Sequence, residues 1–86
     1  MYKNRSSNGR CNLCGKNVAR LRKAMGPMIS QRALADLLQL AGLDVDKNAV
    51  QRIESGQRFV TDIELKILAQ VLNASLDELL TEKGRA

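Results

Sequence analysis

The sequence predicts an all-α domain built from five short helices. Apolar residues recur at the three- and four-residue spacing of a helix rather than in the alternation of a strand. Most of these segments also open on a Ser, Thr, Asp or Asn N-cap and close at Gly or Asn. With 86 residues and only two aromatic side chains, Tyr2 and Phe59, the chain can build one modest core, and that core must be aliphatic.

The first helix is expected to follow a polar N-terminal segment. Asn12 is a suitable N-cap for this helix, and Gly26-Pro27 would end it. Its apolar side would consist of Cys14, Val18, Leu21 and Met25.

The second and third helices have clear boundaries. Ser30 is the expected N-cap of the second helix, and Gly42 would close it. Asp46 and Gly56 have the same two roles for the third. The inward residues of the second helix would be Leu34, Leu37, Leu38 and Ala41.

The last two helices each begin with a capping box, in which a hydroxyl and a Glu three residues later exchange bonds with the backbone. The two pairs are Thr61 with Glu64 and Ser75 with Glu78. These helices are expected over residues 62–72, with Asn73 as a left-handed stop, and 76–81. Their inward residues would be Leu65, Leu68, Leu72, Leu76, Leu79 and Leu80.

The third helix has two different faces. Val50, Ile53 and Glu54 share one side. The opposite side carries long polar side chains of the kinds that bind base edges, because Lys and Arg suit guanine whereas Asn and Gln suit adenine. The base-reading residues predicted on this side are Lys47, Asn48, Gln51 and Arg52.

Charge is distributed unevenly along the chain. Residues 1–32 carry eight basic and no acidic side chains, whereas residues 33–86 carry six basic and nine acidic ones. This asymmetry indicates a nucleic-acid-binding protein, although a solvated basic tail would also produce it. The shortage of aromatic residues argues against stacking on single strands and favours duplex DNA. The predicted organisation is a flexible, disordered basic arm (1–11), a DNA-binding domain (12–81) and a C-terminal tail (82–86).

Residues 15–80 resemble the phage-repressor family of helix-turn-helix domains, the Cro/cI or xenobiotic-response-element type with a lambda-repressor-like fold. The matching motifs are Leu21-Arg22-Lys23, Ser30-Gln31, Leu34-Ala35, Val50-x-Arg52-Ile53-Glu54-x-Gly56, Leu68-Ala69-x-x-Leu72 and Ser75-x-x-x-Leu79. The resemblance implies that Gln31 buttresses the recognition helix. It also implies that the phosphate backbone is contacted by Ser30, Gln31, Arg32, Gln57 and Arg58.

The resemblance further implies an ion pair between Arg22 and Glu54. Physical chemistry supports this pair independently, because a carboxylate on the apolar side of a helix requires a partner and Arg can bind it through two hydrogen bonds.

One feature departs from the family pattern. The distance from Gln31 to Glu54 is longer than usual by roughly one and a half helical turns, and the additional residues fall within 38–46. Either the second helix is extended, or the turn at Gly42–Asp44 is a wider loop. In both cases Val45 is expected to point inward.

Cys11 and Cys14 have the CxxC spacing of a redox motif or of half a zinc site. With no histidine and no third cysteine, one chain cannot close a four-ligand zinc site, although two chains could share one. The third interpretation, which we favour, makes Cys14 a core residue and Cys11 an exposed thiol. We therefore expect no metal or cofactor.

These patterns predict a sequence-specific double-stranded DNA-binding transcriptional regulator, more specifically a repressor, that reads the major groove with helix 47–55. The alternative is an antitoxin or another protein-interaction module of the same fold. The sequence offers no convincing nucleophile–base pair and no glycine-rich phosphate loop, so we do not expect an enzyme.

A domain of this kind usually binds DNA as a homodimer. Four apolar residues are either interface or core: Phe59, Ile63, Ile67 and Leu76. The sequence has no apolar run long enough to cross a bilayer, no signal-peptide pattern and no evident small-molecule ligand. We therefore expect a cytoplasmic protein, and the resemblance to phage repressors implies a bacterial or phage origin and association with the nucleoid.

Overall fold

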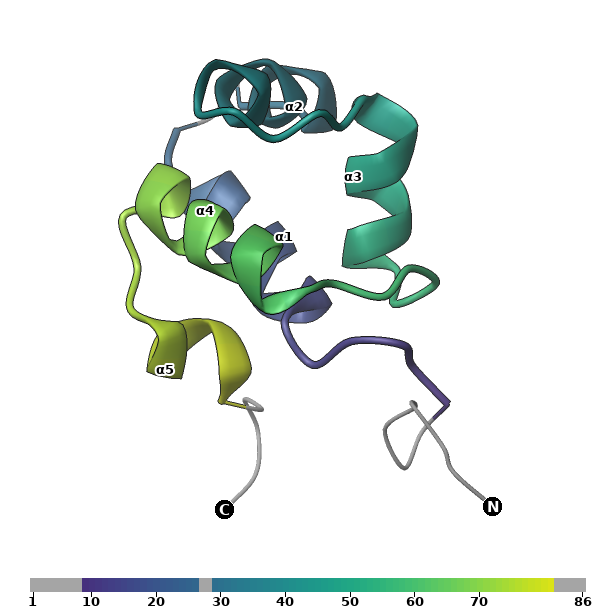
Figure 1. Ribbon diagram of the computed structural model, residues 1–86. Helices are drawn as coiled ribbons and strands as arrows, with labels where there is room; N and C mark the ends of the chain where they lie inside the picture. The colour runs from purple at the N-terminus through teal and green to yellow at the C-terminus, as the bar shows by residue number, and fades with distance from the viewer. Residues whose placement is uncertain (1–8, 27–28, 82–86) are drawn as a thin grey trace.

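A computed structural model describes residues 9–26 and 29–81 of the chain (Figure 1). Within these ranges the chain forms five helices and no strand, which confirms the predicted fold class. The helices are α1 (Gly15–Ala24), α2 (Gln31–Leu40), α3 (Lys47–Glu54), α4 (Asp62–Leu72) and α5 (Leu76–Leu80). The expectations for Pro27, for most of the arm and for the tail at 82–86 concern residues outside the described ranges.

The helices enclose one aliphatic core. α3 stands along one edge of the molecule and packs against α1 and α2, while α4 crosses α1 and α5 packs beside both (Figure 1). Every helix contributes at least one fully buried side chain; the largest are Val18, Leu34, Leu38, Val50, Ile53, Leu68 and Leu79. The core therefore has the aliphatic composition that the sequence requires.

Four of the five predicted helix starts are confirmed in detail. Each N-cap side chain accepts a hydrogen bond from the backbone N–H three residues later. The donor–acceptor distances are 3.0 Å at Ser30, 2.8 Å at Asp46, 3.2 Å at Thr61 and 3.0 Å at Ser75. Both capping boxes are complete, and Asn73 ends α4 with φ of 54°.

The start of α1 differs from the prediction. The N-cap is Cys14, whose side chain makes no capping bond. Asn12, the predicted cap, lies two residues before it, yet its Oδ1 accepts a hydrogen bond from the Gly15 N–H at 2.7 Å. Asn12 thus keeps the three-residue spacing of a capping bond and satisfies the first helical N–H, although the regular helix begins only at Gly15.

Four predicted inward residues are exposed instead. They are Met25, Ala41, Leu76 and Leu80. Each lies at or just beyond a helix end, where the neighbouring helices no longer cover the apolar stripe. In the five-residue α5, only Leu79 reaches the core.

The connection between α2 and α3 is a wide loop, because α2 ends at Leu40 and α3 begins only at Lys47. Of the two alternatives that the sequence left open, the extended helix is wrong and the wider loop is correct. Val45 is buried, as predicted, and its carbonyl oxygen accepts a bond from Gln39 Nε2 at 2.7 Å. Leu43 is also buried, so the loop is anchored by its own apolar side chains.

Of the helices that the structure describes, none combines the length and the apolar composition needed to cross a membrane.

A buried polar residue, Asn17, joins the first helix to the last. The residue is 3% exposed, and its Nδ2 donates to the carbonyl oxygens of Leu79 at 2.8 Å and Thr81 at 2.7 Å. These carbonyls lie at the C-terminal end of α5, where intrahelical donors are missing. Sequence reasoning missed this residue, although its place three residues after Cys14 puts it on the apolar side of α1.

We predict that Asn17→Ala lowers the free energy of unfolding by about 1–3 kcal/mol, because the buried Leu79 carbonyl and the part-buried Thr81 carbonyl lose their donor. Denaturant titration measures the effect. Asn48→Ala is the matched control, since Asn48 is exposed on α3, and it should change stability by less than about 0.5 kcal/mol. Equal stabilities of the two variants would contradict this role.

Candidate nucleic-acid interface

The outer face of α3 carries a cluster of exposed polar side chains. The inner face buries Ala49, Val50 and Ile53 against α1 and α2. The exposed side chains are those of Lys47, Asn48, Gln51, Arg52 and Ser55. All four predicted base-reading residues are therefore brought together on one accessible surface, while their contact with bases stays a prediction.

The carboxylate of Glu54 fixes α3 to its neighbours. Arg22 on α1 donates to it from Nε, at 2.7 Å to Oε2, and from Nη2, at 3.1 Å to Oε1. The two side chains are only 11% and 8% exposed. The remaining Arg22 nitrogen, Nη1, donates to the Ile29 carbonyl at 2.8 Å. The ion pair expected from the sequence is therefore present, with the two-bond geometry that only a guanidinium provides.

Gln31 connects α2 to the same Glu54 carboxylate. Its Nε2 donates to Glu54 Oε1 at 2.9 Å. One carboxylate thus receives donors from α1 and from the first residue of α2, which is the buttressing role implied for Gln31. We refer to Arg22, Gln31 and Glu54 as the Glu54 hub.

The other predicted phosphate contacts lie at two places. Ser30 and Arg32 are exposed at the N-terminus of α2, where the helix dipole and the absence of acidic residues in the first turn favour an anion. Gln57 is exposed in the loop after α3. These positions are accessible to a DNA backbone.

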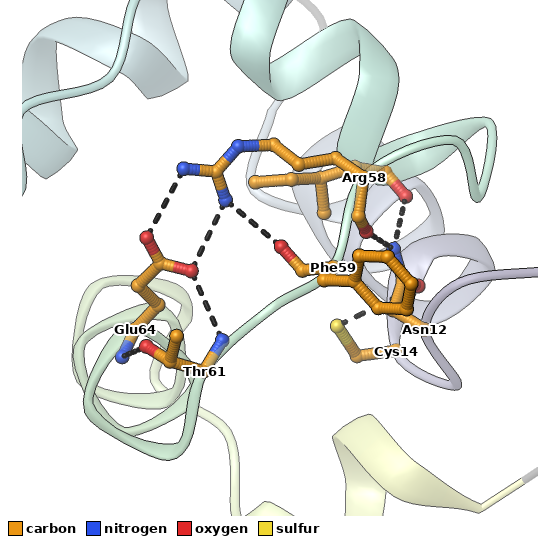
Figure 2. A network of polar contacts seen from close by, with 7 residues as sticks. Asn12, Cys14, Arg58, Phe59, Thr61 and Glu64 are labelled. Atoms are coloured by element: carbon orange, nitrogen blue, oxygen red, sulfur yellow. Dashed lines mark hydrogen bonds and ion pairs between the residues drawn. The ribbon is translucent and has the colours of Figure 1, made fainter. Parts of the chain in front are cut away.

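Arg58 is placed differently from an outward phosphate contact. Its guanidinium pairs with the Glu64 carboxylate through two bonds of 3.1 Å and donates to the Phe59 carbonyl at 3.2 Å (Figure 2). The hydrogen bond from Arg58 is the main cause that lowers the pKa of Glu64. Any contact of Arg58 with a phosphate thus competes with Glu64, a partner that sequence reasoning missed.

The segment before α1 is attached to the end of α3. Arg10 Nη2 donates to the Glu54 carbonyl at 2.8 Å, and the Cys11 N–H donates to the Gly56 carbonyl at 2.8 Å. A flexible arm reaching to residue 11 is therefore wrong for its last two residues. Composition predicted mobility there, but these bonds join residues more than 40 positions apart, which composition does not reveal.

The two cysteines have different surroundings. Cys14 is 1% exposed, and burial raises its pKa from the ordinary 9.0 to about 11. It is therefore a protonated core residue at neutral pH, which confirms the core position expected for Cys14 and disfavours thiolate chemistry there. Cys11 is half-buried rather than exposed as expected, because its backbone lies against Gly56.

Comparison with known proteins gives the family. A family model described as helix-turn-helix matches residues 18–79. The crystal structure of the restriction-modification controller protein C.AhdI from Aeromonas hydrophila is 34% identical in sequence. The match covers 76% of this chain and 88% of that one, with a TM-score of 0.63. A search of curated proteins finds no match.

The fold and its exposed helix, together with these similarities, define a DNA-binding transcriptional regulator that acts on double-stranded DNA. The chain belongs to the helix-turn-helix family of the Cro/cI type.

We predict that Arg22→Ala lowers the free energy of unfolding by about 3–5 kcal/mol, because it leaves the buried Glu54 charge unpaired. Arg20→Ala, an exposed arginine on the same helix, should cost less than about 1 kcal/mol. The double variant Arg22→Met/Glu54→Leu should recover much of the loss in denaturant melts. Strictly additive losses would show that the two residues are not coupled.

Stability should also depend on the ionisation of Cys14. Because its pKa of about 11 in the folded chain exceeds 9.0, stability is full below about pH 9 and falls as the pH rises toward 11. Between pH 8 and 10 the wild type should lose about 1 kcal/mol more than Cys14→Ala does. Cys11→Ala serves as the control and should follow the wild type; parallel losses in the wild type and Cys14→Ala would rule out this titration.

Proposed function

We propose that the chain is a sequence-specific repressor that inserts α3 into the major groove of its operator. The observation that carries this proposal is the exposed polar face of α3, whose opposite side is held by the core and by the Glu54 hub. A helix held in this way can present donors and acceptors to base edges without reorganising, and such preorganisation favours specific binding.

The proposed contacts follow from the chemistry of the side chains. Lys47 and Arg52 would bind guanine through O6 and N7, whereas Asn48 and Gln51 would bind adenine through N6 and N7. Contacts to phosphates would position the protein without discriminating between sequences. These contacts are assigned to Ser30, Gln31, Arg32, Gln57 and, after exchange with Glu64, Arg58.

We also assign a role in DNA binding to the basic residues near the N-terminus. Lys3 and Arg5 would contribute electrostatic contacts to phosphates or the minor groove. Since Arg10 is bonded to α3, the segment available for this role ends before residue 10.

The regulator would bind as a homodimer at two half-sites about 34 Å apart. Exposed apolar side chains near α4 and α5 support an interface there: Phe59 is 50% exposed, Ile63 70% and Leu76 49%. Ile67 is half-buried against the core and would lie at the edge of this surface. We place the dimer in the cytoplasm and assign it no enzymatic activity or small-molecule ligand.

A protein-interaction module, such as an antitoxin, is the second candidate function. The same exposed apolar residues favour it, since a different protein could cover them. The two functions differ in salt dependence, because a DNA-binding regulator exchanges counterions with phosphates and a module without DNA does not.

Selection of bound sites from a random duplex library tests the proposal. We expect a single palindromic motif, with affinity that falls steeply as salt is raised. Enrichment of no motif at low salt would reject sequence-specific binding and favour the interaction module.

At the selected site, Gln51→Ala should weaken binding by about 1–3 kcal/mol and relax preference at one or two base pairs. Competition with singly substituted duplexes measures both effects. Gln70→Ala, which removes an exposed glutamine from α4, is the matched control and should bind as the wild type does. If base preference is unchanged in Gln51→Ala and also in the alanine variants of Lys47, Asn48 and Arg52, α3 is not the base-reading helix.

A further inference from the structure

The recognition helix α3 is short and needs support at its C-terminal end. It has eight residues, about two turns, and a helix of this length is unstable alone. The last carbonyl groups of any helix also lack intrahelical donors. In α3 this end lies directly beside Gln51 and Arg52, two of the proposed base-reading residues.

The segment before α1 supplies side-chain donors at this end, where the Ile53 carbonyl also accepts from the Gly56 N–H at 3.1 Å. Arg10 Nη2 binds the Glu54 carbonyl, and Asn12 Nδ2 binds the carbonyls of Ile53 at 3.1 Å and Arg58 at 2.7 Å. The Asn12 bond to Arg58 is visible in Figure 2, and Figure 1 shows this segment passing close to the lower end of α3. We refer to Arg10, Cys11 and Asn12 as the N-terminal clamp.

Two glycines provide the space for the N-terminal clamp. Gly56 has φ of +81°, and a Cβ atom there would come within 2.6 Å of the Arg10 guanidinium carbon. A Cβ atom at Gly15 would meet Asn12 Oδ1 and the Ile53 carbonyl oxygen. The positive charge of Arg10 also lies at the negative end of the α3 dipole, which is the favourable arrangement.

The side chain and the backbone carbonyl of Glu54 are therefore bound by different parts of the chain. The Glu54 carboxylate is bound by Arg22 and Gln31, whereas the Glu54 carbonyl is bound by Arg10. Removing the clamp leaves the Glu54 hub and the backbone bonds of residues 55–57 in place but takes away the side-chain donors to the carbonyls of Ile53 and Glu54. The final turn, which carries Gln51 and Arg52, would then be less well fixed.

We infer that Arg10 and Asn12 are positioning residues for DNA recognition, which hold the last turn of α3 in its base-reading orientation without contacting DNA themselves. This inference rests on the proposed function of α3. Two other roles would be distinct from this one: a direct phosphate contact by Arg10, and a general contribution of the two residues to stability.

Amide hydrogen exchange of the full chain tests the contact itself, in the absence of DNA. In Arg10→Met, which removes one hydrogen bond from the Glu54 carbonyl, exchange at Ser55, Gly56 and Gln57 should become about tenfold faster. In Asn12→Ala, which removes the bonds to Ile53 and Arg58 and the acceptor of the Gly15 N–H, the acceleration should be at least as large. Amides in α2 and α4 should be unaffected. Unchanged exchange at the end of α3, or equal acceleration throughout the chain, would overturn the inference.

Binding to the selected duplex then tests the role. At a temperature well below the unfolding transition of each variant, Arg10→Met should reduce discrimination at the base pairs read by Gln51 and Arg52 by about five- to tenfold. The salt dependence should stay as in the wild type. Lys16→Met, which removes one charge from the exposed first turn of α1, is the control and should keep full discrimination.

A phosphate contact by Arg10 would give the opposite pattern, namely a salt slope reduced by about one with base preference intact, and would overturn the inference. So would a lowered melting temperature with both binding properties unchanged. If the wild type selects no motif, the proposed function fails and the role in recognition fails with it, whereas the exchange data still report separately on the contact.

Discussion

The arrangement of this molecule depends on how one desolvated carboxylate is satisfied. Glu54 lies on the inner side of α3, and its side chain is 8% exposed, so its charge must be matched within the protein. Arg22 from α1 and Gln31 from α2 provide three donors, which fix the distance and the angle between the three helices. An apolar contact at this position could stabilise the fold equally well, but it would specify the geometry less strictly.

Apolar and polar contacts have different roles in this structure. The aliphatic core supplies most of the stability, because burial is nondirectional and sums over every helix. The Glu54 hub and the N-terminal clamp fix the orientation of α3, because hydrogen bonds weaken steeply when their angles change. Together they hold a two-turn helix whose outer face makes no contribution to the core and is therefore available for binding.

Local chemistry explains which features the sequence predicted. Capping at Ser30, Asp46, Thr61 and Ser75 involves residues three positions apart, so helix starts were predictable. The exposure of Leu76 and Leu80 depends instead on where neighbouring helices end. The bond between Arg10 and Glu54 joins residues 44 positions apart, and no local pattern indicates such a contact. The spacing between α2 and α3 revealed additional residues but could not distinguish a longer helix from a loop. For the interface, periodicity predicted which α3 side chains share a face, but it contained no information about the pairing of Arg58 with Glu64.

As proposed, α3 enters the major groove as a preoriented helix. Dimethyl sulfate protection on the selected duplex tests it most directly, because the reagent methylates guanine N7 in the major groove and adenine N3 in the minor groove. We expect protection of guanine N7 in each half-site, with one protected position lost in Lys47→Ala or Arg52→Ala. Protection of adenine N3 alone, with every guanine N7 still reactive, would contradict it.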